Sequence, residues 1–153
     1  MNTIRTALAV AARLFLGLVF TVFGLNFFLH FLPTPAMPPA AGAFVGALLA
    51  SGYLFPVVKT VEVTAGLMLL SGRFVPLALT LLAPIVVNIL GFHLFVERGG
   101  LGVPLAVLVA GLYLAFANRD AFAPLLRARR LAPAAAEAHL PSPRLATGGR
   151  SAA

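Results

Sequence analysis

The sequence predicts an all-α integral membrane protein, a four-helix bundle with a short interfacial or re-entrant helix between its first and second spans. Hydrophobic residues make up 61% of the 153 residues and charged residues 10%, whereas a soluble domain is about half apolar and a quarter charged. Four apolar runs approach the roughly 20 residues that cross a bilayer core. Arginines also gather on one side of these runs, as in membrane proteins. We assign residues 1–122 to this bundle.

The first span is expected at about residues 14–32, where an apolar run ends before Pro33. With Arg5 and Arg13 ahead of it, this run also resembles a signal peptide. The run is longer than the apolar region of a signal peptide, and three later runs also need lipid, so we expect an uncleaved span. Residues 40–55 are apolar and rich in small side chains, which favours the short interfacial or re-entrant helix.

The other three spans are expected at about residues 53–70, 74–95 and 101–122, separated by short turns that contain glycine. Pro84 lies inside the 74–95 span, and a proline in a membrane helix predicts a kink. Residues 123–153 are rich in alanine, proline and arginine and show no hydrophobic periodicity. We expect them to form a disordered basic tail.

Four spans place both ends of the chain on one side of the membrane, and most arginines lie on that side. The positive-inside rule then places both termini in the cytoplasm, in the inner (plasma) membrane of a bacterial or archaeal cell. The lipid bilayer, and not nucleic acid, is the partner that this charge pattern predicts. The arginines at 127–130 either mark topology alone or also touch anionic lipid. The cytoplasmic arginines are Arg5, Arg13, Arg73, Arg119, Arg127, Arg129, Arg130, Arg144 and Arg150, against Arg98 opposite.

Two opposite charges, Lys59 and Glu62, lie in the middle of the second span. A single charge at the centre of a membrane helix costs ~2.5–3.5 kcal/mol on insertion scales. Side chains three residues apart can meet on a helix, so pairing offsets part of this cost, and protonation of Glu62 is the alternative. Two interpretations remain open: a self-neutralising pair that orients the helix, or a site that handles a proton or a ligand.

Arg13 directly precedes the first span and shares one helix face with Gly17, Thr21 and Gly24. The small side chains of that face predict a close helix–helix contact. Arg13 itself is either a ligand-binding candidate or an interfacial residue whose side chain reaches back to the cytoplasmic surface.

Further polar side chains lie at a similar depth, toward the non-cytoplasmic side. Asn26 and His30 occupy the outer half of the first span, and Asn88 and His93 occupy the outer half of the third. With the charged pair they predict a small polar pocket roofed by the short helix. Asn88 and His93 are ~140° apart on an ideal helix, so both reach the pocket only if Pro84 distorts the helix.

The sequence predicts no metal site. His30 and His93 lie on separate helices at similar depth, which permits haem ligation, but neither has a partner at a ligand spacing. Cysteine is absent, which excludes thiol–disulfide catalysis and iron–sulfur ligation by this chain alone. No phosphate-binding glycine loop and no nucleophile–base pattern is present.

Three segments resemble the DoxX family of small four-helix membrane proteins: "RLFLGLVFTVFGL" at 13–25, "KTVEVTAGLMLLSGR" at 59–73 and "PIVVNILGFH" at 84–93. The resemblance covers roughly residues 10–120 and rests on loose, hydrophobic motifs. It implies a four-helix membrane bundle. The family takes its name from a subunit linked to thiosulfate:quinone oxidoreduction, and other members are associated with redox-stress complexes. The resemblance directs attention to four residues: Arg13, Glu62, Asn88 and His93.

The leading functional hypothesis is a DoxX-like accessory or subunit of quinone-linked redox chemistry, with a quinone as the candidate cofactor and membrane redox proteins as partners. In this hypothesis Glu62 handles a proton, Lys59 sets the proton affinity of that carboxyl, and Asn88 and His93 hydrogen-bond the head group. A stand-alone enzyme is the less favoured form. The alternatives are a small-solute carrier or channel, and a scaffold that binds partner membrane proteins through glycine-rich faces.

Overall fold

The structure is a computed structural model that describes residues 3–33, 36–97 and 99–124. Within these ranges all regular elements are helical and no strand occurs, which confirms the all-α part of the predicted fold class. The elements are α1 (Thr3–Leu29), α2 (Pro39–Ala50), α3 (Leu54–Ser71), α4 (Val75–Gly91), the π-helical turn η1 (Phe92–Val96), α5 (Gly102–Ala117) and α6 (Arg119–Phe122).

Three stretches of helix are long and apolar enough to cross a membrane. They are α1, α3 and the continuous stretch Val75–Val96 that α4 and η1 form together. α2 and α5 are apolar but shorter, with 12 and 16 residues. Three helices of spanning length and composition agree with the expected membrane protein.

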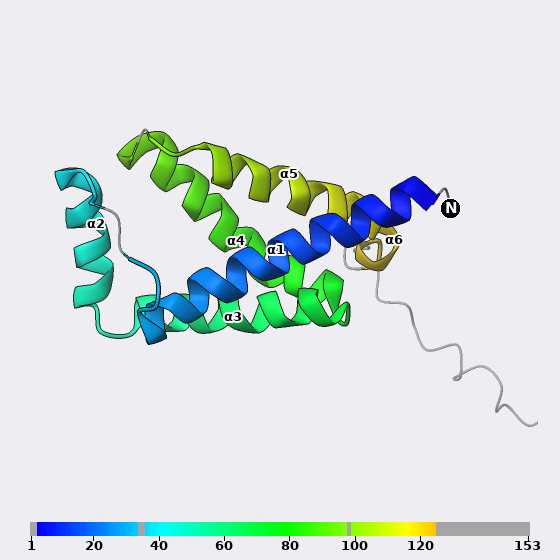
Figure 1. Cartoon of the computed structure of the whole chain (residues 1–153), viewed down its shortest axis with the longest axis horizontal. Helices are drawn as coiled ribbons and strands as arrows, with labels where there is room; N and C mark the ends of the chain where they lie inside the picture. The colour runs from blue at the N-terminus through cyan, green and yellow to red at the C-terminus, as the bar shows by residue number, and fades with distance from the viewer. Residues whose placement is uncertain (1–2, 34–35, 98, 125–153) are drawn as a thin grey trace, which may run out of the picture.

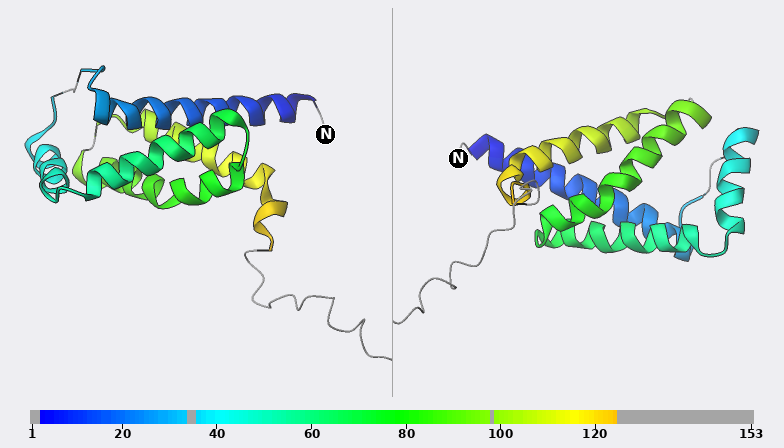
Figure 2. Two further views of the ribbon diagram at one scale, coloured as in Figure 1. Left: turned by 90° about the horizontal axis from the view of Figure 1, so that it is seen from below. Right: turned by 180° about the vertical axis from the view of Figure 1, so that it is seen from behind.

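The four longest helices pack side by side around one apolar core (Figure 1). α1 lies against α3 and α5, and α4 packs against the same two helices from the other side (Figure 2). α2 stands at the end of the molecule away from the N-terminus, next to α3 and η1 (Figure 1). The buried core residues are Leu16, Phe20, Ala65, Leu69, Ala78, Leu79, Leu82, Val107 and Leu114.

α1 and α3 approach each other very closely. A Cβ atom added at Gly66 would lie 2.5 Å from Thr21 Oγ1 and 3.0 Å from the Gly17 carbonyl oxygen. A Cβ atom at Gly24 would lie 2.7 Å from Val63 Cγ2. Only residues without a side chain permit this approach. The helix–helix contact predicted for the Gly17, Thr21 and Gly24 face is confirmed.

The first helix differs from its expected bounds at both ends. α1 begins at Thr3, about three turns before residue 14, and it ends at Leu29 rather than at about residue 32. His30 adopts a left-handed conformation with φ of 52°. The Leu32 N–H then donates to Asn26 Oδ1 at 2.6 Å. A local turn closed by an asparagine side chain therefore ends this helix before the proline is reached.

The fourth expected span, 101–122, is divided into two helices. α5 ends at Ala117, and α6 begins after a break at Asn118. The Asn118 side chain donates from Nδ2 to the Leu114 carbonyl oxygen at 2.8 Å. Asparagine competes in this way with regular helical hydrogen bonding. The expected tail at 123–153 lies almost entirely outside the described residues.

Candidate functional site

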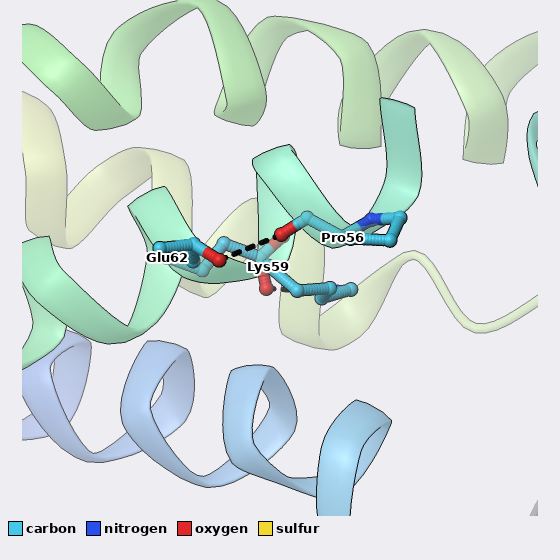
Figure 3. Close-up of polar contacts among 4 residues, drawn as sticks. Pro56, Lys59 and Glu62 are labelled. Atoms are coloured by element: carbon cyan, nitrogen blue, oxygen red, sulfur yellow. Dashed lines mark hydrogen bonds and ion pairs between the residues drawn. The ribbon is translucent and has the colours of Figure 1, made fainter. Parts of the chain in front are cut away.

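The charged pair of α3 is formed within one helix. Lys59 Nζ donates to Glu62 Oε2 at 2.8 Å, and the side chains of these two residues are 18% and 4% exposed. Figure 3 places Pro56, Lys59 and Glu62 on successive turns of the first half of α3. The Lys59 ammonium also lies 5.3 Å from the centroid of the Phe55 ring, within cation–π range. The pair is thus preorganised and its formal charges cancel.

A cavity of about 600 Å³ borders this pair. Its walls come from α2, the first half of α3, the second half of α4 and η1, and most of its lining side chains are apolar. Phe44 of α2 and Phe92 of η1 bring their ring centroids to 5.6 Å and connect α2 to the far wall. A cavity of this size, mostly apolar with a few polar groups, is typical of small-molecule sites. We refer to it as the α2–α3–α4 cavity.

The cavity opens on the outer surface of α3 and α4. Five of its lining residues are exposed: Phe44, Leu54, Val57, Pro84 and Asn88. The described part of α1 contributes no lining residue. The opening therefore faces away from α1, and α2 covers only the end of the cavity.

The α2–α3–α4 cavity brings together four of the seven sequence-predicted residues: Lys59, Glu62, Asn88 and His93. On an ideal α-helix Asn88 and His93 are ~140° apart. The helix continues through Pro84 and then changes to the π-helical turn, where the Glu97 N–H donates to the Phe92 carbonyl at 2.9 Å. A π-helix has more residues per turn, so each residue advances the side chain by a smaller angle. We attribute the shared orientation to this turn rather than to Pro84.

Asn88 and His93 each use one side-chain nitrogen within their own helix. Asn88 Nδ2 donates to the Pro84 carbonyl at 3.0 Å, which leaves its Oδ1 as an acceptor. His93 Nδ1 lies 2.9 Å from the Ile89 carbonyl. Because a carbonyl oxygen only accepts, Nδ1 carries the proton. His93 Nε2 lies 3.7 Å from Glu97 Oε2 at the end of η1.

The other three predicted residues lie outside the cavity. Asn26 accepts the Leu32 N–H, and His30 is an exposed residue at the end of α1. The Arg13 guanidinium reaches the left-handed Gly72 that ends α3, where it occupies the space that a Cβ atom would need. A cation beside the last carbonyls of a helix is favourably placed. Asn26 and His30 thus belong to the end of α1, and the Arg13 side chain lies at the end of α3.

Several residues around the pair were not predicted as site residues. Phe55 precedes Lys59 by four residues, a spacing at which a ring and a cation meet on a helix. Glu97 follows His93 by the same interval. Both spacings are readable in the sequence. Phe44 and Phe92 come together across 48 positions of the chain, and no local pattern signals that contact.

Among the described residues, no group of three or more histidine, aspartate or glutamate side chains is placed to hold a metal ion. Comparison of the chain with protein-family models, with curated proteins and with solved structures gave no match. The resemblance to the DoxX family stays a prediction.

Proposed function

We propose that the protein is a DoxX-like integral membrane protein that holds the polar head of a lipid-soluble ligand, a quinone in the first instance, in the α2–α3–α4 cavity. It serves quinone-linked redox chemistry as an accessory or subunit. One observation carries the proposal: a preorganised pair of half-buried Lys59 and buried Glu62 borders a largely apolar cavity of about 600 Å³. A spanning helix retains such a pair at a cost that an apolar pair would avoid.

The membrane location rests on the surface of the helices. Large apolar side chains point outward on each long helix, and Leu18, Phe23, Val87, Phe95 and Leu112 are all more than half exposed. Contiguous apolar surface of this kind is rare on soluble monomers. α1, α3, α4 with η1, and α5 are the four spans of the proposed bundle. The 16 residues of α5 reach about 24 Å at 1.5 Å per residue, which makes α5 the shortest span. A span of this length requires that the bilayer is locally thin or that α5 lies nearly parallel to the membrane normal.

The orientation follows from where the cations lie. The N-terminal end of α1, the turn between α3 and α4, and α6 share one end of the molecule (Figure 1). Arg5, Arg13, Arg73 and Arg119 belong to these segments. We place this end in the cytoplasm of a bacterial or archaeal cell. α2 then lies at the non-cytoplasmic interface.

The lining of the cavity fits a neutral head group that both accepts and donates hydrogen bonds, as a quinone and its quinol form together do. Lys59 has three donors, of which one is directed to Glu62. On the facing wall Asn88 Oδ1 and the unprotonated His93 Nε2 are acceptors, so they suit the hydroxyl groups of the reduced, quinol form, while the second N–H of Asn88 Nδ2 suits a quinone oxygen. Because the charges of Lys59 and Glu62 cancel, a strongly charged head would add an unbalanced charge. The opening toward the outer surface of α3 and α4 admits an apolar tail from the bilayer.

A bound quinone supplies two-electron, two-proton chemistry, and the electrons come from a partner redox protein. The residues of this chain bind and orient its head. Lys59 donates to a head-group oxygen, and Glu62 accepts or returns a proton at its carboxylate. Asn88 and His93 fix the head against the α4 wall. The apolar remainder of the cavity excludes water, which strengthens each of these contacts.

The test is the small-molecule content of the protein in native lipid nanodiscs, by absorbance and by mass spectrometry of the extract. We expect about one quinone per chain. Glu62→Gln removes a hydrogen bond to a charged group and lowers this content by about tenfold or more. The matched control is Asp120→Asn, which neutralises a described acid outside the cavity and leaves the content unchanged.

Two results contradict the proposal at different points. A wild-type extract that contains only bulk lipid contradicts the proposal that a quinone binds in the cavity. Full quinone content in Glu62→Gln removes the role of Glu62 and leaves the charged pair as a structural feature. A haem absorbance band would direct attention to His30 and His93 instead.

A further inference from the structure

A second hollow lies between α1 and α5, among residues that the α2–α3–α4 cavity does not use. It is a groove of about 550 Å³ along the first half of α1 and the middle of α5. Its lining is almost entirely apolar. Its floor is lined by small side chains, those of Ala11, Ala12, Ala106 and Ala110. The larger side chains of Phe15 and Tyr113 also line it and form its edges. We refer to it as the α1–α5 groove.

The groove ends at a polar and cationic point. The Tyr113 hydroxyl, which lines the groove, donates to the Arg5 carbonyl oxygen at 3.1 Å. The Arg5 side chain is exposed, and it lies one turn before Leu8, which also lines the groove. Arg119 follows α5 at the same end of the molecule, with its guanidinium carbon 4.9 Å from the Phe116 ring centroid. In the described part of the chain neither arginine forms a salt bridge.

Arg5 and Arg119, against Asp120 beside Arg119, leave a net positive charge near the end of the apolar channel. This combination selects among membrane components. A neutral lipid would gain the apolar contact alone. A lipid with an anionic phosphate gains the charge contact as well, and juxtamembrane arginines attract such lipids. A partner helix would also use the apolar contact, and a second copy of this chain would bring further arginines to the same end.

We propose that the α1–α5 groove is a binding site for an anionic glycerophospholipid of the cytoplasmic leaflet. One acyl chain lies along the four alanines, and Arg5 and Arg119 hold the phosphate. The lipid joins the N-terminal part of α1 to the C-terminal part of α5. The inference rests on the proposed membrane location and orientation, and it is independent of the ligand in the α2–α3–α4 cavity.

The test uses the full chain in nanodiscs of phosphatidylcholine with a minor share of phosphatidylglycerol. After transfer to mild detergent, native mass spectrometry counts the lipids that remain bound. We expect one retained phosphatidylglycerol per chain, enriched over its share in the nanodisc. Arg5→Gln lowers the retained ratio of phosphatidylglycerol to phosphatidylcholine about fivefold, and Arg5→Gln with Arg119→Gln lowers it further.

Two further variants separate the groove from general charge. Arg73→Gln removes a cation at the same end of the molecule, in the turn between α3 and α4, and leaves the ratio unchanged. Ala106→Leu fills the groove from an exposed position and lowers retention of lipid with Arg5 intact. Circular dichroism spectra like that of the wild type show that both variants are folded.

The proposal is overturned if the wild type retains both lipids in proportion to their abundance, or if Arg73→Gln acts as strongly as Arg5→Gln. A dimer in the native mass spectrum that Ala106→Leu dissociates also overturns it, because a second copy of the chain then occupies the groove. Each of these results leaves the quinone measurement on Glu62 unaffected.

Discussion

At the residue scale, the Lys59–Glu62 pair makes an asymmetric prediction about stability. Glu62 is 3% exposed, and its carboxylate receives a hydrogen bond from Lys59. Lys59→Met leaves this buried group without its partner, and we expect it to lower the free energy of unfolding by about 3 kcal/mol. The double variant with Glu62→Gln removes both charges, and we expect a smaller loss than from Lys59→Met alone. Unfolding in mixed micelles, followed by circular dichroism, measures both.

The comparison of single and double variants is the informative quantity. If the losses from Lys59→Met and Glu62→Gln simply add in the double variant, the two side chains are not coupled. That result would contradict the hydrogen bond at 2.8 Å as a contributor to stability. Thr64→Val is a control on the exposed face of α3, and we expect a change below about 0.5 kcal/mol.

The sequence predicts local pairs well and distant ones poorly. Lys59 and Glu62 meet because residues three apart are neighbours on any helix. Asn26 illustrates the limit: its depth in the first span agrees with that of the charged pair, but its side chain closes the turn after α1. Depth follows from position in a span. The direction of a side chain follows from helix ends and from neighbouring helices, which the sequence does not state.

At the element scale, the contact of α1 with α3 depends on the absence of a side chain at Gly66. A Cβ atom there would lie 2.5 Å from Thr21 Oγ1 and 2.8 Å from the Thr21 backbone nitrogen. We expect Gly66→Ala to separate the two helices and to lower the free energy of unfolding by about 2 kcal/mol, within the range for overpacking. The midpoint of thermal unfolding in detergent checks this.

Gly111→Ala is the matched control for this contact. Gly111 lies inside α5, and an added Cβ atom there would meet no atom within 4 Å. Alanine favours a helix over glycine, so we expect this variant to be about 0.5–1 kcal/mol more stable than the wild type. Equal destabilisation by the two variants would contradict the close contact of α1 and α3.

The helices themselves were largely predictable, because long apolar runs interrupted by glycine turns leave few alternatives in a chain this hydrophobic. The short helix between the first two spans also follows from composition, and α2 forms at Pro39–Ala50. The π-helical turn was not predictable. It depends on hydrogen bonds shifted by one residue, such as that from the Glu97 N–H to the Phe92 carbonyl, and the pattern of apolar residues does not reveal one extra residue in a turn.

At the scale of the whole molecule, the two hollows lie at opposite ends. The α2–α3–α4 cavity lies next to α2, and the α1–α5 groove runs toward the N-terminal end of α1 (Figure 1). In the proposed orientation the cavity meets the outer leaflet and the groove meets the cytoplasmic leaflet. The two sites therefore contact the lipids of different leaflets. A substitution that blocks one site leaves the other open to its ligand.

The orientation that both proposals share is directly measurable, because the chain contains no cysteine and gives no background in thiol labelling. Ser71 lies at the end of α3 and Gly99 lies before α5, both are exposed, and α4 with η1 separates them. We expect a membrane-impermeant maleimide to label Gly99→Cys in intact cells and Ser71→Cys only after permeabilisation, because most arginines of the chain lie on the Ser71 side of the spans. The reverse labelling pattern would mean that the protein has the opposite orientation and that the groove faces the outer leaflet. Equal labelling of both variants in intact cells would mean that α4 does not cross the membrane.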